Sequence, residues 1–291
     1  MSPEEVREFQ ENMVNAEKGV RLAQHNIAVC YANGEGVVKD QEEAGKWYLK
    51  AATQGFAPSQ SNLGVMHSTG EGAEKDLVKS VLWTRKAADQ GYQLAQCNLA
   101  VFYALGKGVP KNLTQTVTWF RKAAEQGNAT AQFNLGYYYA AGEGIEQDLV
   151  QSASWYRKAA EQDHADAQFF LGQCYTFGHG VEKDPVQAAK WCLKSAEQGN
   201  ADAQTLMGQF YAVGNGVVKD EIEAYAYWNL AGITSERARN YRQQIEADLS
   251  PEGRLLGQQR TKQLQKEITG RVESLERLRK AIEREKLRKE A

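Results

Sequence analysis

The sequence predicts an all-α protein, a right-handed α/α superhelical solenoid, from three observations. Five tryptophans, from Trp47 to Trp191, follow one another at intervals of 36 residues, and Tyr227 holds the next place. Glycine pairs separated by one residue recur with the same period, beginning at Gly34 and Gly36. Apolar residues are spaced by three and four, as on one side of a helix, and no alternating strand pattern occurs. A fixed period of about 20 to 50 residues is the signature of stacked repeats.

One unit shows how each period should fold. Ala131, Leu135 and Tyr139 lie four residues apart and form one stripe of a first helix. Glycines then end that helix, because glycine adopts positive φ without steric cost. Asp148 stands where an N-cap of a second helix is expected, and Trp155 falls on that helix. Each unit is therefore predicted to be a helix, a loop, a second helix and a tight turn.

The domain organisation follows from this period. We expect an N-terminal capping helix, or half-repeat, in residues 1–18, six repeats in residues 19–234 and a C-terminal helical cap in residues 235–291. Ser2-Pro3-Glu4-Glu5 has the form of a helix start, with a cap, a first-position proline and an acidic residue three places on.

The C-terminal cap carries its own apolar stripe, spaced by three and four residues. A terminal element that shields the last hydrophobic face is what a solenoid requires. A short coiled coil that dimerises the chain, or a helix that docks on a partner, stays open as an alternative. The stripe consists of Leu264, Ile268, Val272, Leu275, Leu278 and Ile282.

Composition excludes several classes of function. The 35 Lys and Arg residues balance 37 Asp and Glu, a formal net charge of −2, so no nucleic-acid partner is expected. The apolar runs are too short to span a membrane. The N-terminus has no basic start followed by an apolar stretch, so the chain as given is expected to be cytoplasmic. It would be periplasmic or secreted if a leader had been removed.

No cofactor, metal site or catalytic residue is predicted. The four histidines stand in different registers, and no metal-ligand spacing occurs. His164 and His179, in turn and loop positions, are expected to be solvated. The Gly-x-Gly loops follow helices rather than strands and lack a Gly-Lys-Ser/Thr continuation, which argues against phosphate binding.

The repeat pattern resembles the Sel-1-like repeat, a relative of the tetratricopeptide repeat. It is read most directly in Ala131-Gln132, Leu135-Gly136, Tyr139, Gly142, Gly144, Asp148, Ala153, Trp155 and Lys158-Ala159-Ala160-Glu161-Gln162. The resemblance implies an α/α superhelix with a concave face and a role as a protein-interaction scaffold, in a family that is mostly bacterial.

A cysteine-rich secreted branch of this family carries two cysteines in nearly every repeat and is associated with β-lactam binding and hydrolysis. This chain departs from that branch, because only Cys174 and Cys192 fall in the two helices of one unit. A disulfide between them stays open, but reduced thiols are the expectation. An envelope protein with cell-wall or β-lactam hydrolase activity is therefore an alternative, and a non-enzymatic role is preferred.

By analogy with tetratricopeptide superhelices, one face of the first helices should line the concave groove. Across the third to fifth repeats this face is apolar and aromatic, which suits a peptide or protein partner. Packing of the same rings between adjacent repeats is the alternative. The candidate groove residues are Val101, Leu105, Phe133, Tyr137, Phe169, Gln173 and Phe177.

Three functions are thus open: an adaptor that holds a peptide or protein in its groove, the envelope hydrolase, and an oligomeric scaffold that dimerises through its C-terminal helix. The adaptor is the leading prediction.

Overall fold

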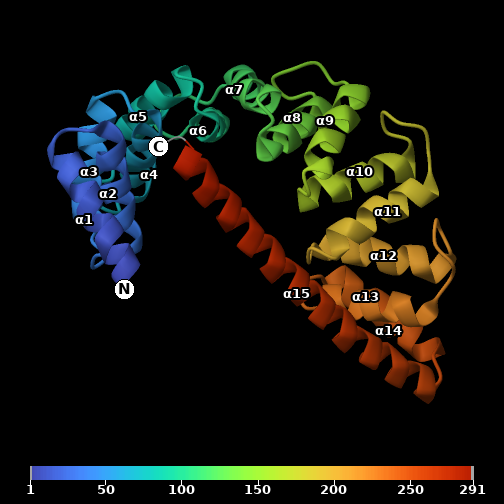
Figure 1. Ribbon diagram of the computed structural model, residues 1–291. Helices are drawn as coiled ribbons and strands as arrows, with labels where there is room; N and C mark the ends of the chain where they lie inside the picture. The colour runs from blue at the N-terminus through green and yellow to red at the C-terminus, as the bar shows by residue number, and fades with distance from the viewer. Residues whose placement is uncertain (1, 290–291) are drawn as a thin grey trace. The chain divides into compact units, whose positions relative to one another are not determined.

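The computed structural model describes residues 2–289, and their side chains as far as residue 278. These residues form fifteen α-helices and no strand, which confirms the all-α prediction. The chain divides into two compact units: unit 1 is Met1–Ala131 with Gly142–Glu146, and unit 2 is Gln132–Ala141 with Gln147–Ala291. Within the units, each 36-residue period contributes an A helix followed by a B helix (Figure 1).

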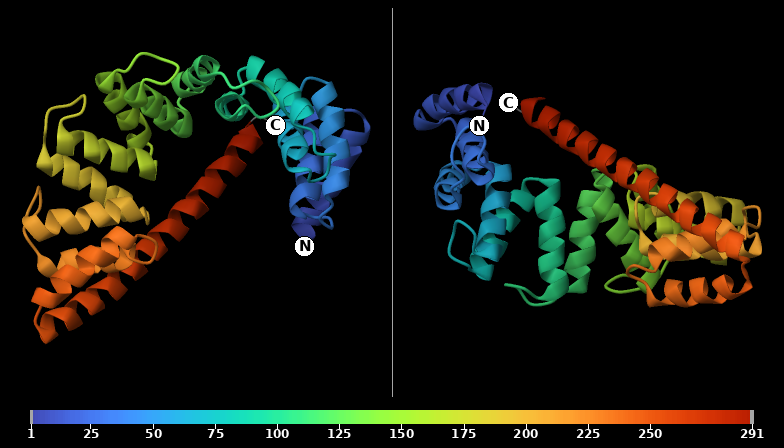
Figure 2. Two further views of the ribbon diagram at one scale, coloured as in Figure 1. Left: turned by 180° about the vertical axis from the view of Figure 1, so that it is seen from behind. Right: turned by 90° about the horizontal axis from the view of Figure 1, so that it is seen from below.

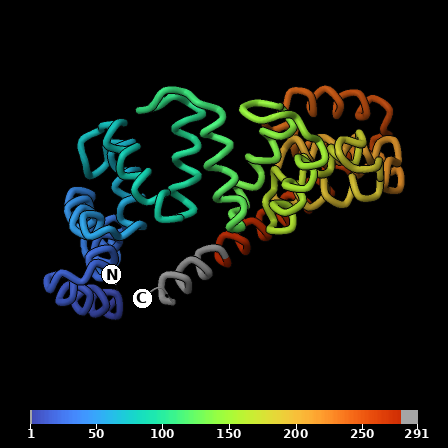
Figure 3. Tube along the Cα trace, turned by 90° about the horizontal axis from the view of Figure 1, so that it is seen from above, coloured from blue at the N-terminus to red at the C-terminus, as the bar shows by residue number. Residues whose placement is uncertain are grey.

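Unit 1 consists of a first helix, α1, followed by three helix pairs. Helices that follow one another in the sequence pack side by side (Figure 3). The A helices are α2, α4 and α6, the B helices are α3, α5 and α7, and the first turn of α8 (Ala129–Ala141) completes the unit. Its helices are α1 (Pro3–Glu17), α2 (Arg21–Asn33), α3 (Gln41–Thr53), α4 (Ala57–Thr69), α5 (Leu77–Asp89), α6 (Gln93–Leu105) and α7 (Leu113–Glu125).

Unit 2 contains the rest of the A helix α8 and continues the alternation. Consecutive helices from α9 to α14 pack together, and the long helix α15 lies along α13 in all views (Figures 1 and 2). Its other helices are α9 (Leu149–Glu161), α10 (Ala165–Phe177), α11 (Pro185–Ala196), α12 (Ala201–Val213), α13 (Glu221–Ala231), α14 (Glu236–Asp248) and α15 (Pro251–Lys289).

Side-chain caps start the B helices, as the sequence predicts. Even Asp76, which lacks an acidic or amide residue three places on, accepts hydrogen bonds from the backbone of Val78 and Lys79. A reciprocal capping box is present in α1, between Ser2 and Glu5. The other caps that accept first-turn N–H groups are Asp40, Asn112, Asp148, Asp184 and Asp220.

The second glycine of each Gly-x-Gly loop lies against the preceding helix pair. Gly72 has φ +73°, and a Cβ there would collide with the backbone carbonyl of Gln41, the first residue of α3. The same contact recurs with Gly108 on Leu77 in unit 1 and with Gly180 on Leu149 in unit 2. Glycine is therefore required at this position both by backbone conformation and by close approach.

A pair of glutamines joins the two helices in each of the first five repeats. Gln54, after α3, donates to the side-chain oxygen of Gln24 on α2 at 2.8 Å, and Gln24 donates to the carbonyl of Ala16 at 3.2 Å. Carbonyls in the last turn of a helix have no partner within that helix. The carbonyl of Ala16 also accepts from the backbone N–H of Gly19, so the glutamine gives it a further bond and links neighbouring helices. The other pairs are Gln90–Gln60 and Gln126–Gln96 in unit 1, and Gln162–Gln132 and Gln198–Gln168 in unit 2.

Helix α1 occupies the place of a B helix. Gly36 lies against the carbonyl of Glu5, just as the later loop glycines lie against the first residue of a B helix. However, Glu8 and Asn12 of α1 stand where α3 carries an alanine and a tyrosine buried under its own A helix. The outer face of α1 is therefore polar and unsuited to hydrophobic packing of a further repeat.

A glycine, Gly257, lets α15 lie close to α13. Gly253 and Gly257 are buried, and a Cβ on Gly257 would lie 2.5 Å from the ring of Tyr225. Further along, Leu264 and Ile268 enter the hydrophobic core of unit 2. Ile268, a member of the apolar stripe for which the sequence left a coiled coil open, is thus a core residue, because the stripe of α15 packs on the last repeats.

Candidate partner-binding surface

The A helices bury one side and expose the other. On α8, Leu135 is fully buried, and a Cβ on Gly136 would lie 2.8 Å from the ring of Tyr156 on α9. A small residue at this position therefore lets α8 approach α9 closely. The opposite side of each A helix is left to solvent, and we call it the A-face. In unit 1 the A-face consists of Val65, Leu94, Asn98, Val101 and Leu105. In unit 2 it consists of Tyr137, Asp166, Phe170, Gln173, Phe177, Asp202, Leu206, Gln209 and Val213.

Three of the predicted groove residues lie on the A-face of unit 2. Tyr137 on α8 is 44% exposed and stacks edge-on with Tyr138 at 5.6 Å between ring centroids. Phe177, at the end of α10, is 54% exposed and stacks on His179 at 5.6 Å. Gln173, one turn before Phe177, is half-buried. These two rings supply apolar surface that unit 2 itself leaves uncovered.

Two predicted residues, Val101 and Leu105, lie on the A-face of unit 1. They are 43% and 57% exposed and stand one turn apart on α6. Val65 on α4 occupies the register of Val101 and is exposed to a similar degree, and Leu94 lies on the same side of α6. Unit 1 therefore carries its own aliphatic A-face, without aromatic rings.

The remaining two predicted residues are turned inward. Phe169 is only 8% exposed and belongs to the core of unit 2. Phe133 is half-buried, with its ring centroid 5.0 Å from that of His164 and 5.6 Å from that of Phe170. The rings of Phe133 and Phe169 thus pack within the protein, which is the alternative to partner binding that the sequence left open.

The sequence missed Phe170 and Leu206, the partly exposed residues that stand beside Phe169 and Thr205 on α10 and α12. The spacing of four residues indicated a different face of the A helices, the one that contains Phe133, Tyr137 and Ala141. The sequence does contain a signal for these positions. In preceding repeats the position equivalent to Phe170 holds asparagine, such as Asn98, and a polar residue is expected where a side chain faces solvent.

The A helices are nearly free of positive charge. In unit 2, residues 161–177 and 197–213 cover two B-to-A turns with α10 and α12, and they contain no Lys or Arg. The equivalent residues of unit 1, 53–69 and 89–105, contain one carboxylate, Asp89, one histidine, His67, and no Lys or Arg. The carboxylates of the unit 2 segments are Glu161, Asp163, Asp166, Glu197 and Asp202.

The histidines have structural surroundings. His164, expected to be solvated, is half-buried: it caps α10 through Nδ1 and stacks on Phe133. His25 is buried, with its Nδ1 2.9 Å from Oγ of Ser59, and burial lowers its pKa to about 4. This histidine is therefore neutral at ordinary pH and packs as a core residue.

The four cysteines are free thiols. Burial raises the pKa of Cys30, Cys97 and Cys174 to about 11, and that of Cys192 to about 12. A raised pKa keeps a thiol protonated and a poor nucleophile. Within the part of the chain that the structure describes, no group of His, Cys, Asp and Glu residues has the arrangement of a metal site.

The B helices carry a different surface. A lysine lies over the ring of each of the five tryptophans from Trp47 to Trp191, three residues after it in the sequence. The ammonium of Lys50 is 3.6 Å from the ring centroid of Trp47, and that of Lys158 is 3.8 Å from the centroid of Trp155. Such cation–π contacts are worth roughly 0.5–1 kcal/mol at exposed sites. They cover the indole faces that would otherwise be open to solvent. In the described residues no helix combines the length and apolarity needed to cross a membrane.

A protein-family comparison places one family over most of the chain. The family model described as Sel1 repeat matches residues 21–56, 57–92, 93–128, 129–164, 165–200 and 201–232. These six segments begin at or next to the first residue of an A helix and agree with the 36-residue period. No curated protein matches the chain.

Solved structures show the same likeness. A Sel1 repeat protein from Oxalobacter formigenes is 34% identical, with a TM-score of 0.66 over 73% of this chain and 85% of that chain. Protein c5321 of uropathogenic Escherichia coli, a protective antigen displaying an SLR fold, is 29% identical, with a TM-score of 0.46 over 92% and 73%. Helicobacter pylori cysteine rich protein B is 28% identical, with a TM-score of 0.37 over 44% and 92%.

Proposed function

Because the chain belongs to the Sel1 repeat family, we propose that it is a non-enzymatic scaffold that binds a protein or peptide on the A-faces of its repeats. Sel1 repeat proteins are in general protein-interaction scaffolds. The observation that carries the proposal is the pair of exposed rings, Tyr137 and Phe177, on the A-face of unit 2. Exposed aromatic side chains are the typical anchors of protein interfaces. Val101 and Leu105 offer unit 1 an aliphatic counterpart.

The test is a double variant, Tyr137→Ala with Phe177→Ala, in the full-length chain. Its matched control is Val150→Ala with Val186→Ala, which removes apolar side chains that are even more exposed from the B helices α9 and α11. Each protein is used as bait in the native lysate, and the captured proteins are quantified by mass spectrometry after circular dichroism has shown the helix content unchanged. We expect the double variant to lose partners that the control retains. Equal recovery by both variants would exclude the A-face of unit 2.

We also propose that residues 1–18 and 235–291 act as caps around the repeats of residues 19–234. The polar outer face of α1 and the packing of α15 on α13 support this division. The free thiols support a reducing compartment and hence a cytoplasmic location, because oxidising compartments favour disulfides. Measuring the redox state of Cys174 and Cys192 in extracts alkylated at lysis tests the location.

A second candidate role, dimerisation through α15, is favoured by one observation. The apolar stripe that packs on unit 2 continues past Val272 to Leu278, which is 57% exposed. A second copy of the helix could cover it. Light scattering on the full-length chain and on Leu278→Glu decides this role: a dimer that the substitution dissociates supports it, and a monomer at both would eliminate it.

A further inference from the structure

We propose that the partner of the unit 2 A-face is a cationic amphipathic helix, bound next to α15. The inference rests on the proposed function, since it names the class of partner that this face would take. Three features of unit 2 carry it: the apolar ends of two A helices, the charge of the turns that precede them, and the way in which α15 is already seated.

The apolar anchors lie at the C-terminal ends of α10 and α12. Phe177 and Val213 hold the same register on the two helices, and both side chains are more than half exposed. Phe170 and Leu206, two turns earlier, are partly exposed on the same side. Two adjacent helices therefore offer paired apolar side chains, which suits the apolar face of a helix better than a single extended side chain.

The N-terminal ends of the same two helices are acidic. Asp166 on α10 and Asp202 on α12 are exposed and hold one register, and Glu161 and Asp163 lie in the turn before α10. These segments contain no Lys or Arg, but Arg271 of α15 already pairs with Glu197, so the negative charge at this edge comes from Glu161, Asp163, Asp166 and Asp202. Such a surface attracts a cationic partner and disfavours an acidic one.

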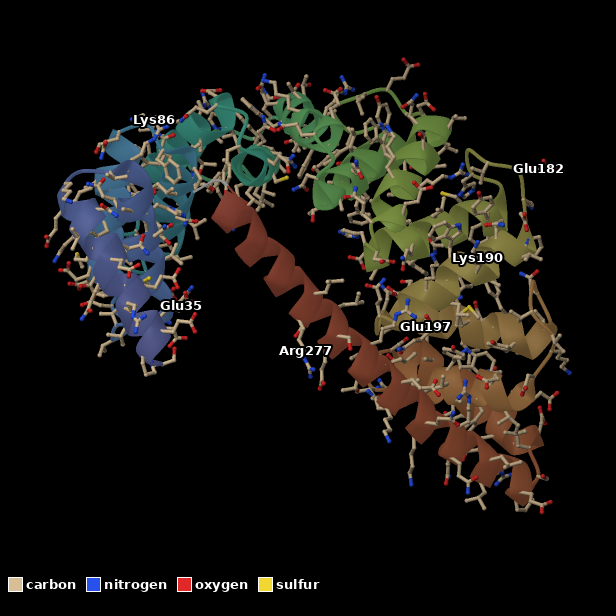
Figure 4. The ribbon with its side chains drawn as sticks, viewed as in Figure 1. Glu35, Lys86, Glu182, Lys190, Glu197 and Arg277 are labelled. Carbon is tan, nitrogen blue, oxygen red and sulfur yellow. The ribbon has the colours of Figure 1, made fainter. Side chains whose placement is uncertain are left out.

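Helix α15 shows how a cationic amphipathic helix binds this edge. Its Arg271 forms an ion pair with Glu197, at the end of α11, and Ile268 lies against Gly199 in the following turn. The next residue, Asn200, donates from Nδ2 to Asp166 at 2.9 Å. The surface on which α15 packs thus continues, through Asn200, to Asp166 on the A-face of α10. Figure 4 shows Glu197 at the side of unit 2 along which α15 runs, and Glu182 at the other end of α11.

The arrangement fixes the orientation of the partner. Its Lys and Arg side chains would face Asp166 and Asp202, beside α15, and its apolar side chains would contact Phe177 and Val213. An acidic helix of the same apolar pattern would meet like charges at the turns and is excluded by repulsion.

The test uses two fluorescein-labelled amphipathic peptides, one built of Leu and Lys and the other with every Lys replaced by Glu. Their binding to the full-length chain is followed by fluorescence anisotropy at low and high salt. We expect the Lys peptide to bind and the Glu peptide not to bind. Asp166→Asn with Asp202→Asn should weaken binding of the Lys peptide roughly fivefold at low salt, since exposed ion pairs are individually weak. High salt should reduce this difference.

The matched control is Glu182→Gln with Glu252→Gln, which changes the net charge equally at exposed carboxylates outside the turns before α10 and α12 and should leave binding unaltered. Equal binding of both peptides, lost in Phe177→Ala, would overturn the inference and retain the proposed function. Binding that depends on the aspartates but not on Phe177 would reduce the site to non-specific charge attraction and count against both. No binding of the Lys peptide would overturn the inference alone, because the capture experiment judges the proposed function independently.

Discussion

The side-chain amide of Gln90 donates to the side-chain oxygen of Gln60 at 2.7 Å, and Gln60 donates in turn to the carbonyl of Ala52 at 3.1 Å. Gln60 is buried, so its bond to the carbonyl of Ala52 is shielded from water. Through this one residue, the A helix α4 is tied to the ends of the B helices on both sides of it. The glutamines that recur beside the apolar stripe are therefore part of the packing between helices.

Replacing Gln60 by Met should lower the free energy of unfolding by about 0.5–1.5 kcal/mol, because the carbonyl of Ala52 keeps only its backbone donor, Gly55, and the amide of Gln90 loses its acceptor, while volume is preserved. Urea denaturation followed by circular dichroism measures the change. Gln151→Met, at an exposed position in the first turn of α9, should stay within about 0.5 kcal/mol of the parent. A loss of unfolding free energy in Gln60→Met no larger than in Gln151→Met would show that the glutamine pairs contribute nothing to stability.

Three glycine-to-alanine changes should separate backbone strain from close contact. Gly270→Ala, in a helix with no atom within 4 Å, should stabilise by up to about 1 kcal/mol. Gly127→Ala, at φ +92° but in open space, should destabilise by about 1–2 kcal/mol. Gly180→Ala adds a collision with the carbonyl of Leu149 and should cost the most. Thermal unfolding of the three variants gives the order, and similar losses at Gly127 and Gly180 would contradict the contact.

Acidification should destabilise unit 1 through His25. Its pKa is about 4 in the folded chain and about 6.5 when unfolded, so below pH 6.5 the unfolded state takes up a proton that the folded state does not. This contribution is fully present above pH 6.5 and is lost as the pH falls toward 4, by an amount on the order of 3 kcal/mol. Denaturation midpoints between pH 7 and pH 4.5 should fall less in His25→Phe, which places in this register the residue found at Phe133. An identical pH dependence in both proteins would refute the assignment.

Docking of α15 should depend on Gly257. Its Cα lies so close to Tyr225 that Gly257→Leu should separate α15 from α13 and raise hydrogen exchange over residues 254–272. Gly270→Leu lies in open space on the same helix and is the control. Unchanged protection in Gly257→Leu would mean that Leu264 and Ile268 suffice to hold the helix.

The thiols should be slow to react. Because burial raises the pKa of Cys174 and Cys192, iodoacetamide at neutral pH should label them only after unfolding. Four equivalents of thiol should appear in denaturant without reductant. A shortfall of two would indicate a disulfide between Cys174 and Cys192.

The period of the sequence predicts the fold well because each position recurs in a similar environment. Trp47 and its successors mark the B helices, and the loop glycines mark their starts, so one correctly read repeat determines the others. The A-face was harder to locate, because Phe133 and Tyr137 differ by a small rotation around the helix axis while one ring is packed and the other is exposed. Spacing alone does not resolve that rotation. It is set by the angle at which the next repeat packs.

The C-terminal helix shows a second limit. Its stripe predicts an amphipathic helix, but Ile268 fits a coiled-coil position and a core position equally well. Gly257 is the discriminating signal, because it permits the close approach to Tyr225 on α13 that a coiled-coil seam does not need. In a sequence, glycine within a helix indicates only lowered helix propensity.

The contact made by the second glycine of each Gly-x-Gly loop also bears on how such a chain can gain or lose repeats. Gly72 and Gly108 both rest on a backbone carbonyl, an atom that every residue supplies. Excising residues 57–92 from unit 1 would bring Gly108 to the carbonyl of Gln41 and Gln96 to that of Ala52, with each joint chemically unchanged. Whole 36-residue repeats can therefore replace one another. In-frame duplication or loss of one repeat changes the number of stacked helices and preserves these glycine and glutamine contacts between repeats.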